Sequence, residues 1–131
     1  MKKHGALNSE IDKLLADLGH TDQLTIGDLG LPVPTGVKKI DLALKLGSPS
    51  FEEVLLVMQQ EMAVEAIVLA EEIKTENAEQ WQLIQKTFPN VPIRFVPHEA
   101  FKGETKESKA IIRTGEATPY SNIILQAAVI F

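Results

Sequence analysis

The side chains of this sequence that can move a proton lie in a few short segments. His20 follows a helix-like apolar stretch, and Asp28 and His98 each follow a run typical of a strand. An imidazole can both donate and accept a proton near neutral pH, so His20 is a candidate general acid or base. A carboxylate such as Asp28 can accept a proton or orient a hydroxyl group. Together these residue types suit proton-transfer chemistry on a polar substrate.

A polar stretch between two apolar runs near the C-terminus is a candidate ligand-binding loop. Arg113 and Glu116 flank a Thr-Gly pair that can turn the backbone, and the simplest role for Arg113 is an ion pair that supports the loop through Glu116. The loop ends in Tyr120, Ser121 and Asn122, which offer hydrogen-bond donors and acceptors. A polar loop held between two buried strands is a good place for a ligand.

Structural roles for the same residues remain open. A histidine just past a helix can bind the free carbonyls of the helix end, and an aspartate after a strand can cap a turn. His4, His20 and His98 are the only histidines, and no His-x-His or i,i+4 pair supports a zinc site, so no metal is expected.

The elements that must position these residues alternate along the chain. Capping residues and apolar spacing predict helices over 8–18, 50–62, 77–88 and 98–105, with Gly19 as a left-handed stop. Strands are expected over 23–26, 39–44, 66–70, 93–96, 110–113 and 122–130. This alternation predicts a single α/β domain over 1–131, a three-layer α/β/α sandwich around a largely parallel sheet. In such sheets ligands bind beyond the carboxyl ends of the strands, where Asp28, His98 and the polar loop would meet.

Composition excludes several classes of function. With 131 residues and 44% apolar content the chain can bury roughly two-thirds of its unfolded surface. A net charge of -5 without a basic stripe argues against nucleic acid, and no apolar run is long enough to span a membrane. The absence of cysteine excludes thiolate metal sites and suits a reducing, cytoplasmic setting. Nucleotide-binding glycine motifs are missing, so no cofactor is expected, and small molecules and further copies of the chain remain as partners.

Several segments, taken in order, resemble the family of ribose pyranases and fucose mutarotases. The resemblance covers the whole chain and departs from the usual pattern at Leu29, where relatives carry a smaller residue. The segments that carry it are Lys2-Lys3-His4-Gly5, Leu18-Gly19-His20-Thr21-Asp22, Asp28-Leu29-Gly30-Leu31-Pro32-Val33-Pro34, Glu61-Met62-Ala63-Val64-Glu65, Ala70-Glu71-Glu72-Ile73-Lys74, His98-Glu99-Ala100-Phe101-Lys102, Arg113-Thr114-Gly115-Glu116 and Pro119-Tyr120-Ser121-Asn122.

The resemblance implies a D-ribose pyranase, an isomerase of ribose catabolism that interconverts the pyranose and furanose forms of D-ribose. It implies His20 as the proton donor and Lys102 as a further residue of the pocket. It also implies a cytoplasmic homodecamer with sites near subunit boundaries, which suits the apolar tail over 123–131. A mutarotase of fucose or another sugar, and a non-catalytic sugar-binding module, remain alternatives. The substrate-binding residues that it implies are Asp28, His98, Tyr120, Ser121 and Asn122.

Overall fold

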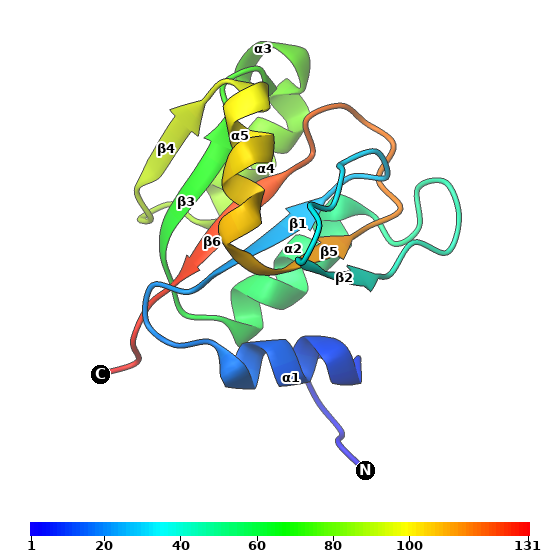
Figure 1. Ribbon diagram of the computed structural model, residues 1–131, viewed down its shortest axis with the longest axis vertical. Helices are drawn as coiled ribbons and strands as arrows, with labels where there is room; N and C mark the ends of the chain where they lie inside the picture. Colours follow the sequence, from blue (N-terminus) through cyan, green and yellow to red (C-terminus); the bar gives the residue numbers. More distant parts are fainter.

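The computed structural model describes residues 1–131, and its centre is a six-stranded sheet. The strands lie in the order β2-β5-β1-β6-β3-β4 (Figure 1). Strand β6 is antiparallel to both of its neighbours, and the other neighbouring pairs are parallel. The predicted α/β sandwich with a largely parallel sheet is confirmed. The strands are β1 (Gln23–Gly27), β2 (Lys38–Asp41), β3 (Val64–Ala70), β4 (Ile93–Val96), β5 (Ser108–Arg113) and β6 (Ile123–Ala127).

Helices cover both faces of the sheet. In Figure 1, α5 crosses in front of the strands, whereas α2 and α4 lie behind them. The larger apolar core joins α1, α2 and α4 to one face of the sheet, and a smaller core centred on Phe101 joins α5 to the other. Adjacent residues of β5 take part in different cores, since Ile111 packs under α5 and Ile112 faces α2. The helices are α1 (Ser9–Asp17), α2 (Phe51–Glu61), α3 (Ile73–Glu76), α4 (Ala78–Thr87) and α5 (His98–Glu104).

The predicted helix starts are confirmed by side-chain caps. The side-chain oxygens of Asn8, Ser50 and Asn77 accept hydrogen bonds from backbone N–H groups in the first turns of α1, α2 and α4. The prediction that Gly19 takes the left-handed conformation is wrong. Thr21 takes it instead, with φ of 71°, and the N–H of Gly19 is held by the carboxylate of Asp22 at 2.9 Å.

The largest differences from the expected strand boundaries lie at the C-terminal ends of two strands. Strand β2 stops at Asp41, three residues early, and β6 stops at Ala127. The last residues of the chain leave the sheet, and Ile130 and Phe131 are fully or almost fully exposed. The expected burial of this tail therefore does not occur within a single chain. None of the helices has both the length and the apolar character needed to cross a membrane.

Candidate active site

One edge of the sheet collects most of the predicted site residues. Strands β1, β4 and β5 run in the same direction, so the residues that follow them leave at the same edge. Asp28 follows β1, His98 begins α5 after β4, and the polar loop connects β5 to the start of β6. The prediction that these three segments meet beyond the carboxyl ends of the strands is confirmed.

Asp28 is held by Asn122 across the edge of the sheet. The side-chain oxygen of Asn122 accepts the N–H of Asp28 at 2.9 Å, and its amide nitrogen donates to the Asp28 carboxylate at 3.1 Å. The other carboxylate oxygen accepts the N–H of Gly30 at 2.9 Å. Burial raises the pKa of Asp28, and the hydrogen bonds from Gly30 and Asn122 oppose that rise. Asn122 is 1% exposed and both ends of its amide bind Asp28, and its predicted contact with a sugar stays a prediction.

His98 and Tyr120 form an aromatic wall beside this carboxylate. Their rings meet edge to face with centroids 5.1 Å apart, and the imidazole also stacks on the ring of Phe101 with centroids 6.2 Å apart. The backbone N–H of His98 donates to the carboxylate of Glu72 at 2.8 Å. The Nδ1 atom of His98 is buried and has no hydrogen-bond partner in the chain. These contacts fix the imidazole plane and leave one ring nitrogen unsatisfied.

The loop that carries Tyr120 is anchored by Asn77, which sequence reasoning identified only as a helix start. The Asn77 amide nitrogen donates to the Pro119 carbonyl at 2.7 Å and to the Ser121 hydroxyl at 3.3 Å. The Ser121 hydroxyl is buried and also bonds to Thr118 at 2.8 Å. This anchoring accompanies a left-handed Tyr120, with φ of 57°. The hydroxyl of Ser121 is thus committed to the loop itself, and its predicted contact with a ligand stays a prediction.

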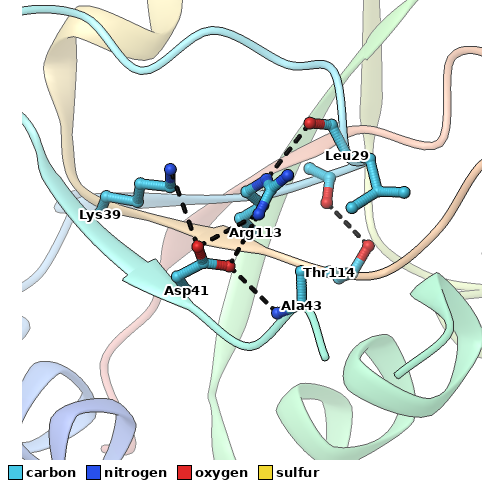
Figure 2. Close-up of polar contacts among 7 residues, drawn as sticks. Leu29, Lys39, Asp41, Ala43, Arg113 and Thr114 are labelled. Atoms are coloured by element: carbon cyan, nitrogen blue, oxygen red, sulfur yellow. Dashed lines mark hydrogen bonds and ion pairs between the residues drawn. The ribbon is translucent and has the colours of Figure 1, made fainter. Parts of the chain in front are cut away.

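Arg113 has a different partner from the one expected. Its guanidinium binds the Asp41 carboxylate at 3.1 and 3.2 Å and the Leu29 carbonyl at 3.2 Å (Figure 2). The expected pair with Glu116 is wrong, because strand register places Asp41 directly opposite Arg113. Glu116 instead accepts the N–H of Phe51 at the start of α2.

His20 lies at the opposite edge of the sheet, because it precedes β1 whereas Asp28 follows it. The five residues of β1 alone span about 16 Å. The imidazole donates to the carboxylate of Glu65 at 2.8 Å rather than binding helix carbonyls, and the His20 side chain is 52% exposed. Hydrogen bonds from the Gln126 amide and from His20 lower the pKa of Glu65. A single chain therefore does not bring His20 to the other predicted site residues.

The surface around His20 is hollowed and apolar. A cavity of about 540 Å³ lies there, and its walls include Leu15, Met62 and the last residues of the chain, from Ala127 to Phe131. The main hollows of the single chain do not contain Asp28, His98 or Tyr120.

Lys102, the further pocket residue implied by the resemblance, lies in the last turn of α5. It forms an ion pair with Glu99 at 2.7 Å, one turn earlier on the same helix. No group of three or more histidine and acidic side chains is placed to hold a metal ion. The side chains gathered around Asp28 offer hydrogen bonding and proton transfer.

Comparison with known proteins gives close full-length matches. The RbsD / FucU transport protein family matches residues 1–130. A D-ribose pyranase of Bacillus licheniformis is 59% identical over 131 residues, which is all of both chains. The solved structure of Bacillus subtilis RbsD complexed with D-ribose is 55% identical, with a TM-score of 0.97 and complete coverage of both chains.

A more distant structure shares the fold alone. The fucose mutarotase of Streptococcus pneumoniae, solved in complex with L-fucose, is 22% identical with a TM-score of 0.84, and the match covers 99% of this chain and 100% of that one. Its sequence identity is less than half that of the Bacillus proteins, although the backbone arrangement is retained. The family match over 1–130 and the full-length relatives lead to one assignment: the chain belongs to the RbsD / FucU transport protein family.

Proposed function

We propose that this protein is a D-ribose pyranase, an isomerase that interconverts the six-membered and five-membered ring forms of D-ribose. The observation that carries the proposal is full-length similarity to proteins named D-ribose pyranase, at up to 59% identity, together with a 55% identical structure that holds D-ribose. The fucose mutarotase is far less similar in sequence, which favours ribose over fucose. A cysteine-free chain suits the reducing conditions of the cytoplasm, the location that goes with this proposal.

The reaction requires only proton movements. In the pyranose, the hydroxyl on C1 loses its proton, the bond from C1 to the ring oxygen breaks, and that oxygen gains a proton to give the open aldehyde. The hydroxyl on C4 then loses its proton as its oxygen attacks C1, and the carbonyl oxygen is protonated to give the furanose. Protons lost and gained balance. A well-placed acid or base contributes about 10²–10⁴-fold to such a step.

The Asp28 edge supplies groups that match the first half of this chemistry. Asp28 is half-buried, and burial raises its pKa, which makes its carboxylate a stronger proton acceptor. The imidazole of His98 and the hydroxyl of Tyr120, which lie against each other, offer hydrogen bonds to the sugar. In this proposal Asp28 accepts the hydroxyl proton, and His98, Tyr120 and the Ser121 segment orient the sugar. Asn122 holds Asp28 in place.

The proton donor comes from a second copy of the chain. His20 is separated from Asp28 by the length of β1, so one chain cannot place both against one sugar. His20 is half exposed beside an apolar hollow and an exposed apolar tail, which are features of a surface that another copy covers. Packing the His20 end of one copy on the Asp28 edge of another would complete the site and cover both. A closed assembly such as the decamer repeats this contact around a ring.

Saturation-transfer NMR on equilibrated sugars tests the proposed function. For a D-ribose pyranase, irradiating a pyranose resonance of D-ribose reduces the furanose resonances in proportion to enzyme concentration, and the effect on L-fucose is much weaker. Stronger transfer between the anomers of L-fucose would favour the fucose mutarotase. Ligand line broadening without transfer in either sugar would identify a sugar-binding module and contradict the proposal.

A further inference from the structure

The peptide group between Leu29 and Gly30 is held at both ends. Its N–H donates to the Asp28 carboxylate at 2.9 Å, and its carbonyl accepts a hydrogen bond from the Nε of Arg113 at 3.2 Å. The N–H and C=O of a trans peptide lie in one rigid plane and point in opposite directions. Arg113 and Asp28 are therefore joined through a single rigid unit.

Arg113 is itself fixed from the other side, as Figure 2 shows. Its Nη1 binds both oxygens of Asp41, and Asp41 also accepts the N–H of Ala43 at 3.1 Å. Burial acts to raise the pKa of Asp41, but the hydrogen bonds from Ala43 and Arg113 outweigh it and lower this pKa. The carboxylate thus stays ionised across the neutral range, and Arg113 keeps its anchor.

The backbone beneath this chain of contacts is equally constrained. Strand register places Arg113 between Gly27 of β1 and Asp41 of β2. The N–H and the hydroxyl of Thr114 both donate to the Gly27 carbonyl, at 2.9 and 2.8 Å, and the N–H of Leu29 donates to the Glu116 carbonyl at 2.9 Å. The residues that follow β5 therefore hold the turn after β1 on both sides of Asp28.

We propose that Arg113 is a positioning residue for Asp28: it fixes the Leu29–Gly30 peptide so that the peptide N–H remains directed at the Asp28 carboxylate. This inference rests on the proposed function, in which Asp28 meets the sugar. A charged donor on the carbonyl polarises the peptide and strengthens the hydrogen bond that its N–H makes. That bond favours the ionised form of Asp28, which is the form that accepts a proton.

The other arginine of the chain shows what a purely structural ion pair looks like. Arg94 binds Glu104 through two short bonds, 2.7 and 2.8 Å, between β4 and the end of α5. No hydrogen bond or ion pair joins either residue to Asp28, Asn122 or the polar loop. Arg113 makes the longer bonds to its carboxylate but adds the contact to the Asp28 turn, and that contact sets the two arginines apart.

Several charged or titratable groups surround Asp28 and enter any change in its protonation. His98 at the start of α5 acts on it electrostatically, and Tyr120 lies against His98. Arg113 at the end of β5 faces the turn, with Asp41 and Lys39 of β2 behind it. These positions give two explanations of an effect of Arg113: through the peptide, or through its electric field alone.

Two variants separate the peptide contact from the field. Arg113→Gln removes both, whereas Asp41→Ala removes a negative charge and frees Arg113 from its anchor. If only the electric field matters, loss of the negative Asp41 carboxylate makes the ionised form of Asp28 more favourable and lowers the pKa of Asp28. If Arg113 positions the peptide, the weakened contact raises that pKa. The two explanations therefore predict opposite signs for Asp41→Ala.

The experiment is a carbon-13 NMR titration of aspartate carboxyl groups without sugar, with the Asp28 signal assigned by its loss in Asp28→Asn. We expect the Asp28 midpoint to rise by roughly half a unit to one unit in Arg113→Gln and to rise less in Asp41→Ala. The matched control Arg94→Gln leaves it unchanged. In saturation transfer, the pH below which ribose exchange is lost rises together with the Asp28 midpoint, and exchange recovers at higher pH.

An unchanged Asp28 midpoint in Arg113→Gln, or a fall in Asp41→Ala, overturns the inference. A weaker affinity for ribose with an unchanged midpoint also overturns it, because Arg113 would then act on the sugar directly. Asp41 lies exposed at the end of an edge strand, so Asp41→Ala keeps the test available if Arg113→Gln does not fold. Absence of ribose exchange in the wild type contradicts the proposed function, whereas the titration still tests the positioning of Asp28.

Discussion

The two edges of the sheet differ in how completely a single chain organises them. At the Asp28 edge, segments far apart in the sequence are bonded together, with Asp28 on Asn122 and Gly27 on Thr114. At the opposite edge, the half-exposed imidazole of His20 has one carboxylate partner, and the tail beyond Ala127 has left the sheet. The Asp28 edge is held by hydrogen bonds within one chain, whereas the His20 edge has few such contacts.

This difference separates binding from catalysis. Groups that orient a sugar must hold a fixed geometry before the sugar arrives, and the bonded edge does so without help from another chain. The proposed proton donor needs a position that no single chain supplies, so we place it in the contact between two copies. Sugar binding is then a property of one edge, and ring exchange is a property of two edges brought together. Substitutions at each edge should have different consequences.

The largest effect is expected from His20→Ala. Removing the proposed proton donor lowers ribose ring exchange by about 10²–10⁴-fold. Ribose affinity changes little, because the sugar-orienting groups lie at the other edge. Saturation-transfer NMR measures the exchange and calorimetry the affinity. Loss of affinity equal to the loss of exchange would show that the two edges are not separate in function.

A smaller effect is expected from Asn122→Ala, and it falls on ribose affinity. The variant loses the oxygen that accepts the Asp28 N–H and the amide nitrogen that donates to the Asp28 carboxylate, both in a buried setting. Ribose affinity therefore weakens by roughly ten- to a hundredfold. The pKa of Asp28 rises further because an opposing hydrogen bond is gone, and exchange is lost at a higher pH as the solution is acidified. Calorimetry and a pH profile of exchange test this. Gln126→Ala, at the far end of β6, is the control and keeps its ribose affinity.

The smallest effect is expected from Glu65→Gln. An exposed ion pair orients His20 only loosely, so exchange falls by about two- to fivefold. The folded pKa of Glu65 is lowered, so its contribution to stability is present above the unfolded value and is lost as pH falls through the folded value. The difference in melting temperature between wild type and variant should therefore exist at neutral pH and vanish in acid. If the difference in melting temperature persists in acid, the stabilisation does not come from the charge of Glu65.

Local patterns predicted the fold and half of the site. The direction rule for parallel strands placed Asp28, His98 and the polar loop at one edge, and capping side chains marked the helix starts. These inferences need only short segments of sequence. The position of His20 relative to Asp28 depends on the order of the elements, because the two residues precede and follow the same strand. The family resemblance assigned both to one site and did not indicate that a single chain separates them.

The contacts that escaped prediction are those set by register between distant segments. Arg113 pairs with Asp41 because β2 and β5 align at those residues, and nothing in the local sequence distinguishes Asp41 from the nearer Glu116. Asn77 was predicted as a helix start, and its second role on the Tyr120 loop arises from contacts more than forty residues away. Sequence spacing carries no signal for such pairs.

The central claim is that His20 of one copy acts with Asp28 of another, and mixing two inactive variants tests it most directly. His20→Ala and Asp28→Ala are each inactive alone, and they are unfolded together, refolded and assayed by saturation transfer. If the site is shared, a symmetric assembly of equal amounts recovers about a quarter of wild-type exchange, because that fraction of contacts combines an intact His20 with an intact Asp28. Mixed assemblies that show no exchange would contradict the claim and place both residues of each site in one chain.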